Sequence, residues 1–178
     1  LALTTDLYTK GSYTADASSI YKKRYRYSGN VRLSYAYSIN SEKELPDYSA
    51  QKDFHIYWTH SQDPKANPYR SFSANISAGS SKYYQNTISS VNNFLSNTFQ
   101  SSVAYAKSFP DKPINLGISV NHSQNIITND IRITAPDVSF NVSRISPFKR
   151  KKVIGAQRWY EKIGTSYSLR ATNYIQTK

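Results

Sequence analysis

The chain has 178 residues with 16 Tyr, 7 Phe, no Cys and no Met, and it carries a net charge of +12. This aromatic content excludes a disordered chain, which has too little apolar surface to offset the entropy of ordering. The absence of Cys excludes disulfides and thiolate metal sites, and a transmembrane helix is excluded because no stretch approaches the roughly 18 consecutive apolar residues that it needs.

Alternation between apolar and polar residues runs through the chain, as it does in β-strands, because successive strand side chains point to opposite faces. In chain order, we expect strands within residues 1–9, 13–21, 31–39, 54–59, 72–77, 99–109, 116–121, 138–143 and 163–170. Most of them approach the roughly 9 to 11 residues with which a tilted strand crosses a bilayer. Leu1 begins inside this pattern with no signal peptide before it, so we expect the chain to be part of a longer polypeptide.

The two faces of these strands differ in chemistry, which separates a membrane barrel from a soluble β domain. A soluble sandwich shows the same alternation, but its outward residues are often charged. Here the polar face is mostly Ser, Asn, Thr, Gly and Ala, which suits a water-filled lumen. The residues expected to face lipid are Val31, Leu33, Tyr35, Tyr37, Phe54, Ile56, Trp58, Leu116, Ile118, Val120, Val138, Phe140 and Val142. The residues expected to face the lumen are Arg32, Ser34, Ser38, Ser119, Asn121, Ser139, Asn141 and Ser143.

The fold predicted by this pattern is all-β, an antiparallel transmembrane β-barrel of which the chain supplies about nine strands. Tyrosines near the strand ends fit the aromatic girdles at the two membrane interfaces. These tyrosines are Tyr8, Tyr13, Tyr21, Tyr25, Tyr27 and Tyr37. We expect residues 1–178 to be part of a single outer-membrane barrel domain.

Turn-forming residues predict where the strands connect. Short turns are expected at residues 11–12, 28–30 and 110–113, and long connections at residues 40–53 and 80–98. Barrels alternate tight periplasmic turns with long extracellular loops. The alternation here is imperfect, so the orientation of the strands stays open.

The sequence offers little that resembles an active site, and we expect no enzyme and no cofactor. His55 and His60 are five residues apart and therefore point to opposite faces of one strand, while His122 lies in a distant strand, so no metal site is expected. Asp6 and Asp16 would face each other if the turn around Gly11 were symmetric, and such a pair could share a proton. Two hydrated carboxylates in a wide lumen are the simpler interpretation.

Two basic runs occur at expected strand ends. They supply candidate lipid-phosphate contacts at Lys22, Lys23, Arg24, Arg26, Lys149, Arg150, Lys151 and Lys152. Cations interleaved with Tyr also bind nucleic acid, through phosphate contacts and base stacking. Their position at strand termini favours lipid phosphates, because snorkelling Lys and Arg side chains belong there.

Four segments have a distinctive sequence: Tyr-Lys-Lys-Arg-Tyr-Arg-Tyr-Ser-Gly-Asn at residues 21–30, Trp-Thr-His-Ser-Gln-Asp-Pro-Lys-Ala-Asn-Pro at 58–68, Pro-Phe-Lys-Arg-Lys at 147–151 and Trp-Tyr-Glu-Lys-Ile-Gly at 159–164. They resemble segments of the Bacteroidetes-type branch of the LptD family of lipopolysaccharide-assembly proteins. The second segment is long and specific. The resemblance extends from about Tyr8 to the last residue.

The resemblance implies a large closed barrel in the outer membrane of a Gram-negative bacterium. In that family a lipoprotein partner, LptE, plugs the barrel, a periplasmic jelly roll precedes it, and a periplasmic lipopolysaccharide-transport bridge delivers the lipid. The lipid then passes between the first and last barrel strands. This chain matches the strands and turns but no gate residue, and it lacks the Cys pairs found in some relatives. Another outer-membrane barrel, such as a porin or receptor, and a soluble basic β domain that binds nucleic acid remain the alternative interpretations.

Overall fold

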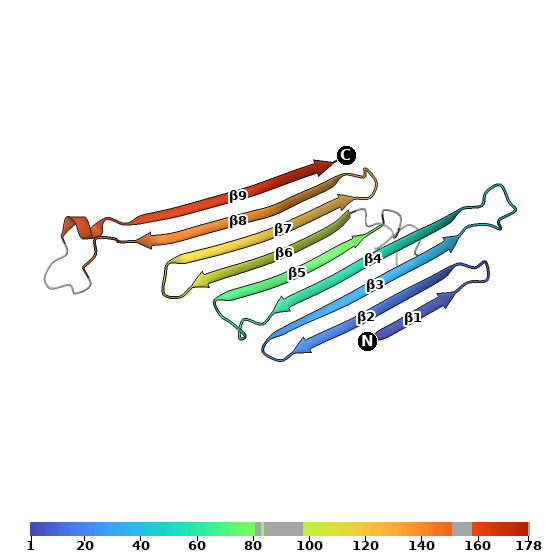
Figure 1. Ribbon diagram of the computed structural model, residues 1–178, viewed down its shortest axis with the longest axis horizontal. Coiled ribbons are helices and arrows are strands. Elements are labelled where there is room, and N and C mark those ends of the chain that lie inside the picture. The colour runs from blue at the N-terminus through green and yellow to red at the C-terminus, as the bar shows by residue number, and fades with distance from the viewer. Residues whose placement is uncertain (81–82, 84–97, 151–157, 178) are drawn as a thin grey trace.

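The computed structural model describes residues 1–80, 83, 98–150 and 158–177. In this part of the chain, nine antiparallel strands form one sheet in which each strand pairs with the next in sequence (Figure 1). The strands are β1 (Ala2–Leu7), β2 (Tyr13–Lys23), β3 (Tyr27–Ile39), β4 (Ala50–Gln62), β5 (Arg70–Gly79), β6 (Thr98–Phe109), β7 (Ile114–Asn125), β8 (Ile131–Ile145) and β9 (Thr165–Thr177). The prediction of an all-β fold with about nine strands is confirmed.

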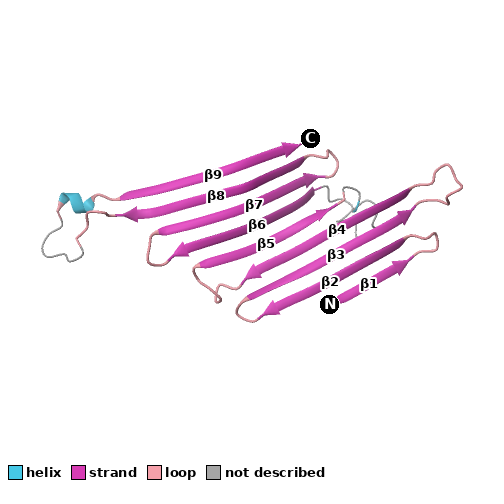
Figure 2. Cartoon of the chain, in the orientation of Figure 1, coloured by secondary structure: helices cyan, strands magenta, loops and turns pink. Residues whose placement is uncertain are grey.

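The described sheet is a single open layer. β1 and β9 lie at its opposite edges, so the sheet does not close on itself, as expected for part of a barrel (Figure 2). A short 3₁₀ helix, η1 (Trp159–Lys162), precedes β9. No helix in the described ranges is long and apolar enough to cross a membrane.

The β2–β3 hairpin turns earlier than its sequence suggests. Its pairing runs from Tyr13 opposite Tyr37 to Lys23 opposite Tyr27, which leaves only residues 24–26 for the turn. The turn predicted at residues 28–30 is therefore wrong, and these residues begin β3. Gly29 is needed there for close approach, because a Cβ atom at this position would lie 2.2 Å from the ring of Tyr21.

The β1–β2 hairpin does not have the symmetric turn on which a facing pair of Asp6 and Asp16 depends. Leu7 pairs with Tyr13, and the intervening turn contains Gly11 at a φ of 84°, a conformation that glycine adopts without strain. This register sets Asp6 opposite Thr14 rather than opposite Asp16. The facing pair of carboxylates that a symmetric turn would give is therefore not formed, and proton sharing between Asp6 and Asp16 is not supported.

The predicted starts of β4 and β8 also differ from the observed ones. Residues 50–53 belong to β4, so the connection after β3 is shorter than the predicted 40–53. β8 begins at Ile131, well before the predicted residue 138, because its register shifts between Thr134 and Asp137 and hides the simple alternation. Pro136 lies within this irregularity, where a residue without an N–H group is tolerated.

Candidate functional site

The strand register brings the predicted apolar residues together on one face of the sheet. In β3 and β4, Leu33 pairs with Ile56, and in β7 and β8, Ile118 pairs with Val138. Strands β5 and β6 continue the same row through the Phe72–Tyr105 pair. The thirteen residues expected to face lipid, Val31, Leu33, Tyr35, Tyr37, Phe54, Ile56, Trp58, Leu116, Ile118, Val120, Val138, Phe140 and Val142, thus lie on this apolar face. Their contact with lipid stays a prediction.

Burial in the β3–β4 region is inverted relative to a water-soluble protein. On the apolar face, Leu33 is 47% exposed and Phe54 is 48% exposed. On the polar face, the neighbouring Ser34 is 7% exposed and Asp53 is 3% exposed. A soluble domain buries its apolar residues and leaves few contiguous apolar patches in water. The exposed apolar face therefore needs a nonaqueous neighbour.

Aromatic side chains gather at both ends of the apolar face. Near the β1–β2 turn, the ring of Tyr13 lies 6.0 Å from that of Tyr35 and 5.4 Å from that of Tyr37. At the other end of β2 and β3, Tyr21 and Tyr27 lie 6.1 Å apart. Tyr13 and Tyr21 are eight residues apart, or about 27 Å along a strand. A tilt of about 40° reduces this to about 21 Å along the membrane normal, near the roughly 25 Å height of the apolar band in outer-membrane barrels.

The second aromatic group extends across three more side chains, and we call Tyr21, Tyr27, Trp58, His60 and Phe72 the aromatic cluster. Nε1 of Trp58 donates to the hydroxyl of Tyr21 at 2.8 Å, and that hydroxyl lies 2.9 Å from Nδ1 of His60. The His60 ring lies 5.4 Å from Phe72 and 5.7 Å from Tyr27. These bonds give the Trp58 indole, the Tyr21 hydroxyl and the His60 ring partners within an apolar surface, which suits an interfacial depth.

The opposite, polar face carries the predicted lumen residues. Alternation along the strands places all of them there: Arg32, Ser34, Ser38, Ser119, Asn121, Ser139, Asn141 and Ser143. The Ser34 hydroxyl donates to Asp16 on β2. Farther along the same face, Asp137 accepts from Arg170 at 2.9 Å and 3.0 Å and from Thr172 at 2.9 Å.

Two residues that follow β5, Ser80 and Tyr83, lie against polar-face side chains of β4. The Ser80 hydroxyl donates to Asp53 at 2.7 Å, and the ring of Tyr83 stacks on His55 at 5.0 Å. The Phe99 ring lies 5.5 Å from that of His55. This packing explains why polar residues of β4 are buried although the sheet is a single layer.

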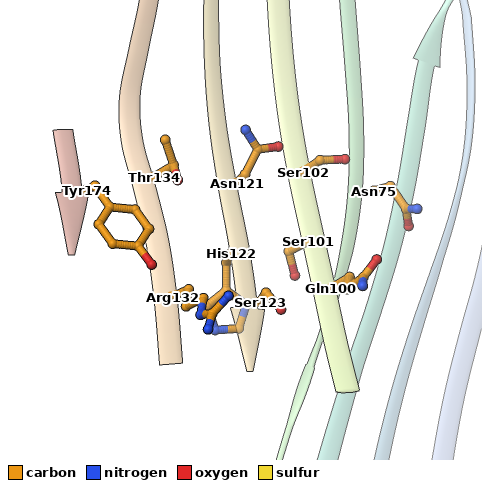
Figure 3. A pocket seen from close by; sticks show the side chains of 10 residues that line it. All are labelled: Asn75, Gln100, Ser101, Ser102, Asn121, His122, Ser123, Arg132, Thr134 and Tyr174. Carbon is orange, nitrogen blue, oxygen red and sulfur yellow. The ribbon is translucent and has the colours of Figure 1, made fainter. Parts of the chain in front are cut away.

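A hollow of about 400 Å³ opens where β5 and β6 separate (Figure 3). The pairing of β5 with β6 stops at Asn75 and Ser102. Beyond it, the Ser101 hydroxyl accepts from the N–H of Ser77 at 3.0 Å and donates to the carbonyl of Ser77 at 2.9 Å. Ten residues from five strands line this polar hollow: Asn75, Gln100, Ser101, Ser102, Asn121, His122, Ser123, Arg132, Thr134 and Tyr174. All but Ser101 and His122 lie on the polar face.

The polar hollow was only partly foreseen. Asn121 was expected on the lumen side, whereas Arg132, Thr134 and Tyr174 were missed because they flank the register shift of β8 or follow it on β9. Hydroxyl, amide and guanidinium groups of this kind bind hydrated, oxygen-rich molecules. The hollow can therefore accommodate a polar chain or saccharide.

Two of the histidines considered as metal ligands, His55 and His60, lie on opposite faces of the sheet. His55 pairs with Ser34 and lies on the polar face, whereas His60 pairs with Gly29 and lies on the apolar face. The prediction that the two histidines point to opposite faces of one strand is confirmed. Among the described residues, no three His, Cys, Asp or Glu side chains come together as metal ligands.

The two basic runs have different surroundings. Lys23, Arg24 and Arg26 lie at the β2–β3 turn, whereas Lys22 pairs with Ser28 on the polar side. In the second run, Lys149 and Arg150 follow β8, and Lys151 and Lys152 lie outside the described residues. Arg150 forms an ion pair with Glu161 of η1. The Arg150 guanidinium and the N–H of Arg158 lower the pKa of the Glu161 carboxyl.

The register, the inverted burial and the polar hollow define an all-β protein of the β-barrel type, of which the described strands form part of the wall. The family model described as LptD protein matches residues 1–178, and the chain belongs to this family. LptD proteins are outer-membrane proteins of lipopolysaccharide assembly. No curated protein and no solved structure matches the chain significantly.

Proposed function

We propose that the chain forms part of the wall of an outer-membrane translocon that inserts lipopolysaccharide into the outer leaflet. The observation that carries this proposal is the match of the LptD family model to the whole chain. The wall acts passively: its apolar face lies in hydrocarbon and its polar face lines the lumen. No bond is made or broken, so the protein is not an enzyme.

The separation of the two faces supports this role physically. Arg32 and Asn121 lie on the polar face, while Leu33 and Val120, one residue away, lie on the apolar face. An amphipathic saccharide-bearing lipid needs both environments during its passage. The polar hollow supplies hydrogen-bonding groups at a size that suits sugar rings.

We also propose two partners from the family resemblance. An LptE-like lipoprotein would occupy the lumen against the polar face, and a periplasmic lipopolysaccharide-transport bridge would deliver the lipid. The small Ser and Ala side chains of the polar face leave room for such a plug.

Depletion of the intact protein in its native bacterium tests the transport role. Newly made lipopolysaccharide should disappear from the cell surface and accumulate on the periplasmic side. Normal export in depleted cells, together with altered uptake of a small solute, would contradict this proposal and favour a porin or receptor.

Site-specific photocrosslinking tests the assigned faces. A crosslinker at Asn121 should capture the lipoprotein plug or lipopolysaccharide, whereas the same group at Val120 should capture bilayer lipid. The two positions are adjacent on β7, so expression and depth are matched. Equal capture of the plug from both positions would refute the assignment.

A further inference from the structure

Two turns at one end of the sheet bring four cations around a single hollow. Arg24 and Arg26 come from the β2–β3 turn, Lys65 comes from the β4–β5 connection, and Arg70 begins β5. The N–H of Asp63 donates to the carbonyl of Arg26 at 2.9 Å and ties the two turns together. These cations, with Tyr25, Tyr27, His60, Gln62 and Ala66, line a space of about 760 Å³ that we call the turn hollow.

The positive charge of the turn hollow is not neutralised within the described part of the chain. None of its four cations forms an ion pair there, since the ion pairs found are those of Arg150 and Arg170. The carboxylate of Asp63 accepts instead from the backbone N–H of Lys65 at 2.9 Å. Unpaired cations that share a concave site favour an anionic ligand.

A further cation beside the turn hollow adds to its positive charge. Arg70 lies directly opposite Lys107 on β6. Like charges at facing positions destabilise a sheet unless an anion or water screens them. The Nζ atom of Lys107 lies 4.6 Å from the centre of the Phe109 ring, which keeps the ammonium group near the end of the strand.

Tyr25 holds part of the cation set in place. Its φ is 58°, in the left-handed region that a bulky side chain rarely adopts. Nζ of Lys65 lies 5.3 Å from the ring centre, and Cζ of Arg24 lies 4.7 Å from it. A strained residue that carries two cations over its ring is a feature of preorganised sites.

The position of the turn hollow on the sheet identifies the class of ligand. Tyr27, His60, Gln62 and Arg70 all lie on the apolar face, and the hollow borders the aromatic cluster. From the middle of β3 outward, the face therefore passes from aliphatic to aromatic to cationic residues. A bilayer has the same order, with hydrocarbon, then the interface, then phosphate.

We propose that the turn hollow binds the phosphate of an anionic lipid of the surrounding bilayer, whose acyl chains lie along the apolar face. The ligand is a bilayer lipid rather than cargo in the lumen, because the hollow opens on the apolar face. The inference rests on the proposed orientation of the sheet in the membrane, but it does not require lipopolysaccharide transport.

Binding to lipid nanodiscs and native mass spectrometry of the intact protein test this site. The protein should retain phosphatidylglycerol in preference to phosphatidylcholine. The variant R24Q/R26Q/R70Q should bind phosphatidylglycerol about 100-fold more weakly, since each basic residue near an anionic surface contributes roughly fivefold. The control K10Q/K43Q/K52Q removes the same charge at the opposite end of the sheet and should bind normally.

A second variant tests the same site in case the triple variant does not fold. Tyr25→Gly suits the positive φ of this position and should fold, but it removes the ring beneath Arg24 and Lys65. It should weaken phosphatidylglycerol binding several-fold, with heat-modifiable electrophoretic migration unchanged.

Three results would overturn the proposal. They are unchanged phosphatidylglycerol binding in both hollow variants, an equal loss in the control, and inorganic phosphate that competes as well as phosphatidylglycerol does. The last result would indicate a site for free anions. Normal lipopolysaccharide export on depletion would contradict the transport role and leave lipid binding intact.

Discussion

Leu33→Arg is the sharpest test of the membrane orientation. Leu33 is the central residue of β3, with six residues of the strand on either side, and its side chain is 47% exposed on the apolar face. If that face meets hydrocarbon, the substitution places a guanidinium group at the depth where a charge costs most.

The expected cost follows from the length of the strand. The 13 residues of β3 extend about 44 Å, and a tilt of about 40° leaves about 34 Å along the membrane normal. Leu33 is then about 17 Å from either end of β3, beyond the reach of an arginine side chain. Arginine at the midplane of a barrel wall should lower the free energy of unfolding by about 2 to 4 kcal/mol.

Urea unfolding of the intact protein in lipid vesicles measures this difference. Asn121→Arg is the control, because Asn121 is exposed on the polar face near the middle of β7 and should change stability by about 0.5 kcal/mol or less. Arg32 already shows that a guanidinium is accommodated on that face beside Leu33. Equal effects of the two substitutions would refute the two-faced wall.

Three further predictions concern the aromatic cluster and the connection after β8. Gly29→Val should destabilise the protein by about 1 to 3 kcal/mol in the same urea assay, since the added Cβ would displace the Tyr21 ring. A Gly29→Ser variant as stable as the wild type would contradict this clash. Tyr21→Phe removes the acceptor of the Trp58 indole and should cost about 1 kcal/mol, with a changed Trp58 emission spectrum. The lowered pKa of Glu161 means that its bond to Arg150 is fully effective above the ordinary carboxyl pKa of about 4.3 and is lost as the pH falls through the lowered value. Protease cleavage near η1 should rise below that pH in the wild type, and Glu161→Gln should abolish the pH dependence.

The strands could be predicted because alternation is a local property. Each of the nine predicted segments overlaps an observed strand, and the register confirms that Leu33 and Ile56 share one face. The ends of strands were less predictable. Ser-Gly-Asn at residues 28–30 has the composition of a turn, but the glycine there makes room for the Tyr21 ring instead.

The candidate sites depended on contacts that no local pattern encodes. The turn hollow joins two turns about 40 residues apart, and only Arg24 and Arg26 of its four cations stood out in a basic run. Lys65 and Arg70 are isolated charges in the sequence. Ser34 shows a further limit. Alternation predicts that it faces an open lumen, yet its side chain is buried and its hydroxyl donates to Asp16. We therefore expect a substitution at Ser34 to be poorly tolerated.

The unpaired edge of β9 has a consequence for the proposed membrane orientation. β9 has 13 residues and pairs with β8 on one side, while no strand in the described part of the chain pairs with its other side. In hydrocarbon, an N–H or carbonyl group without a partner costs several kcal/mol, so an open edge of this length is not stable in a bilayer. The membrane orientation therefore requires a partner for the free edge of β9, from further strands or from β1 on closure. If the apolar face meets lipid, as we propose, the unpaired edge of β9 requires that the wall be completed.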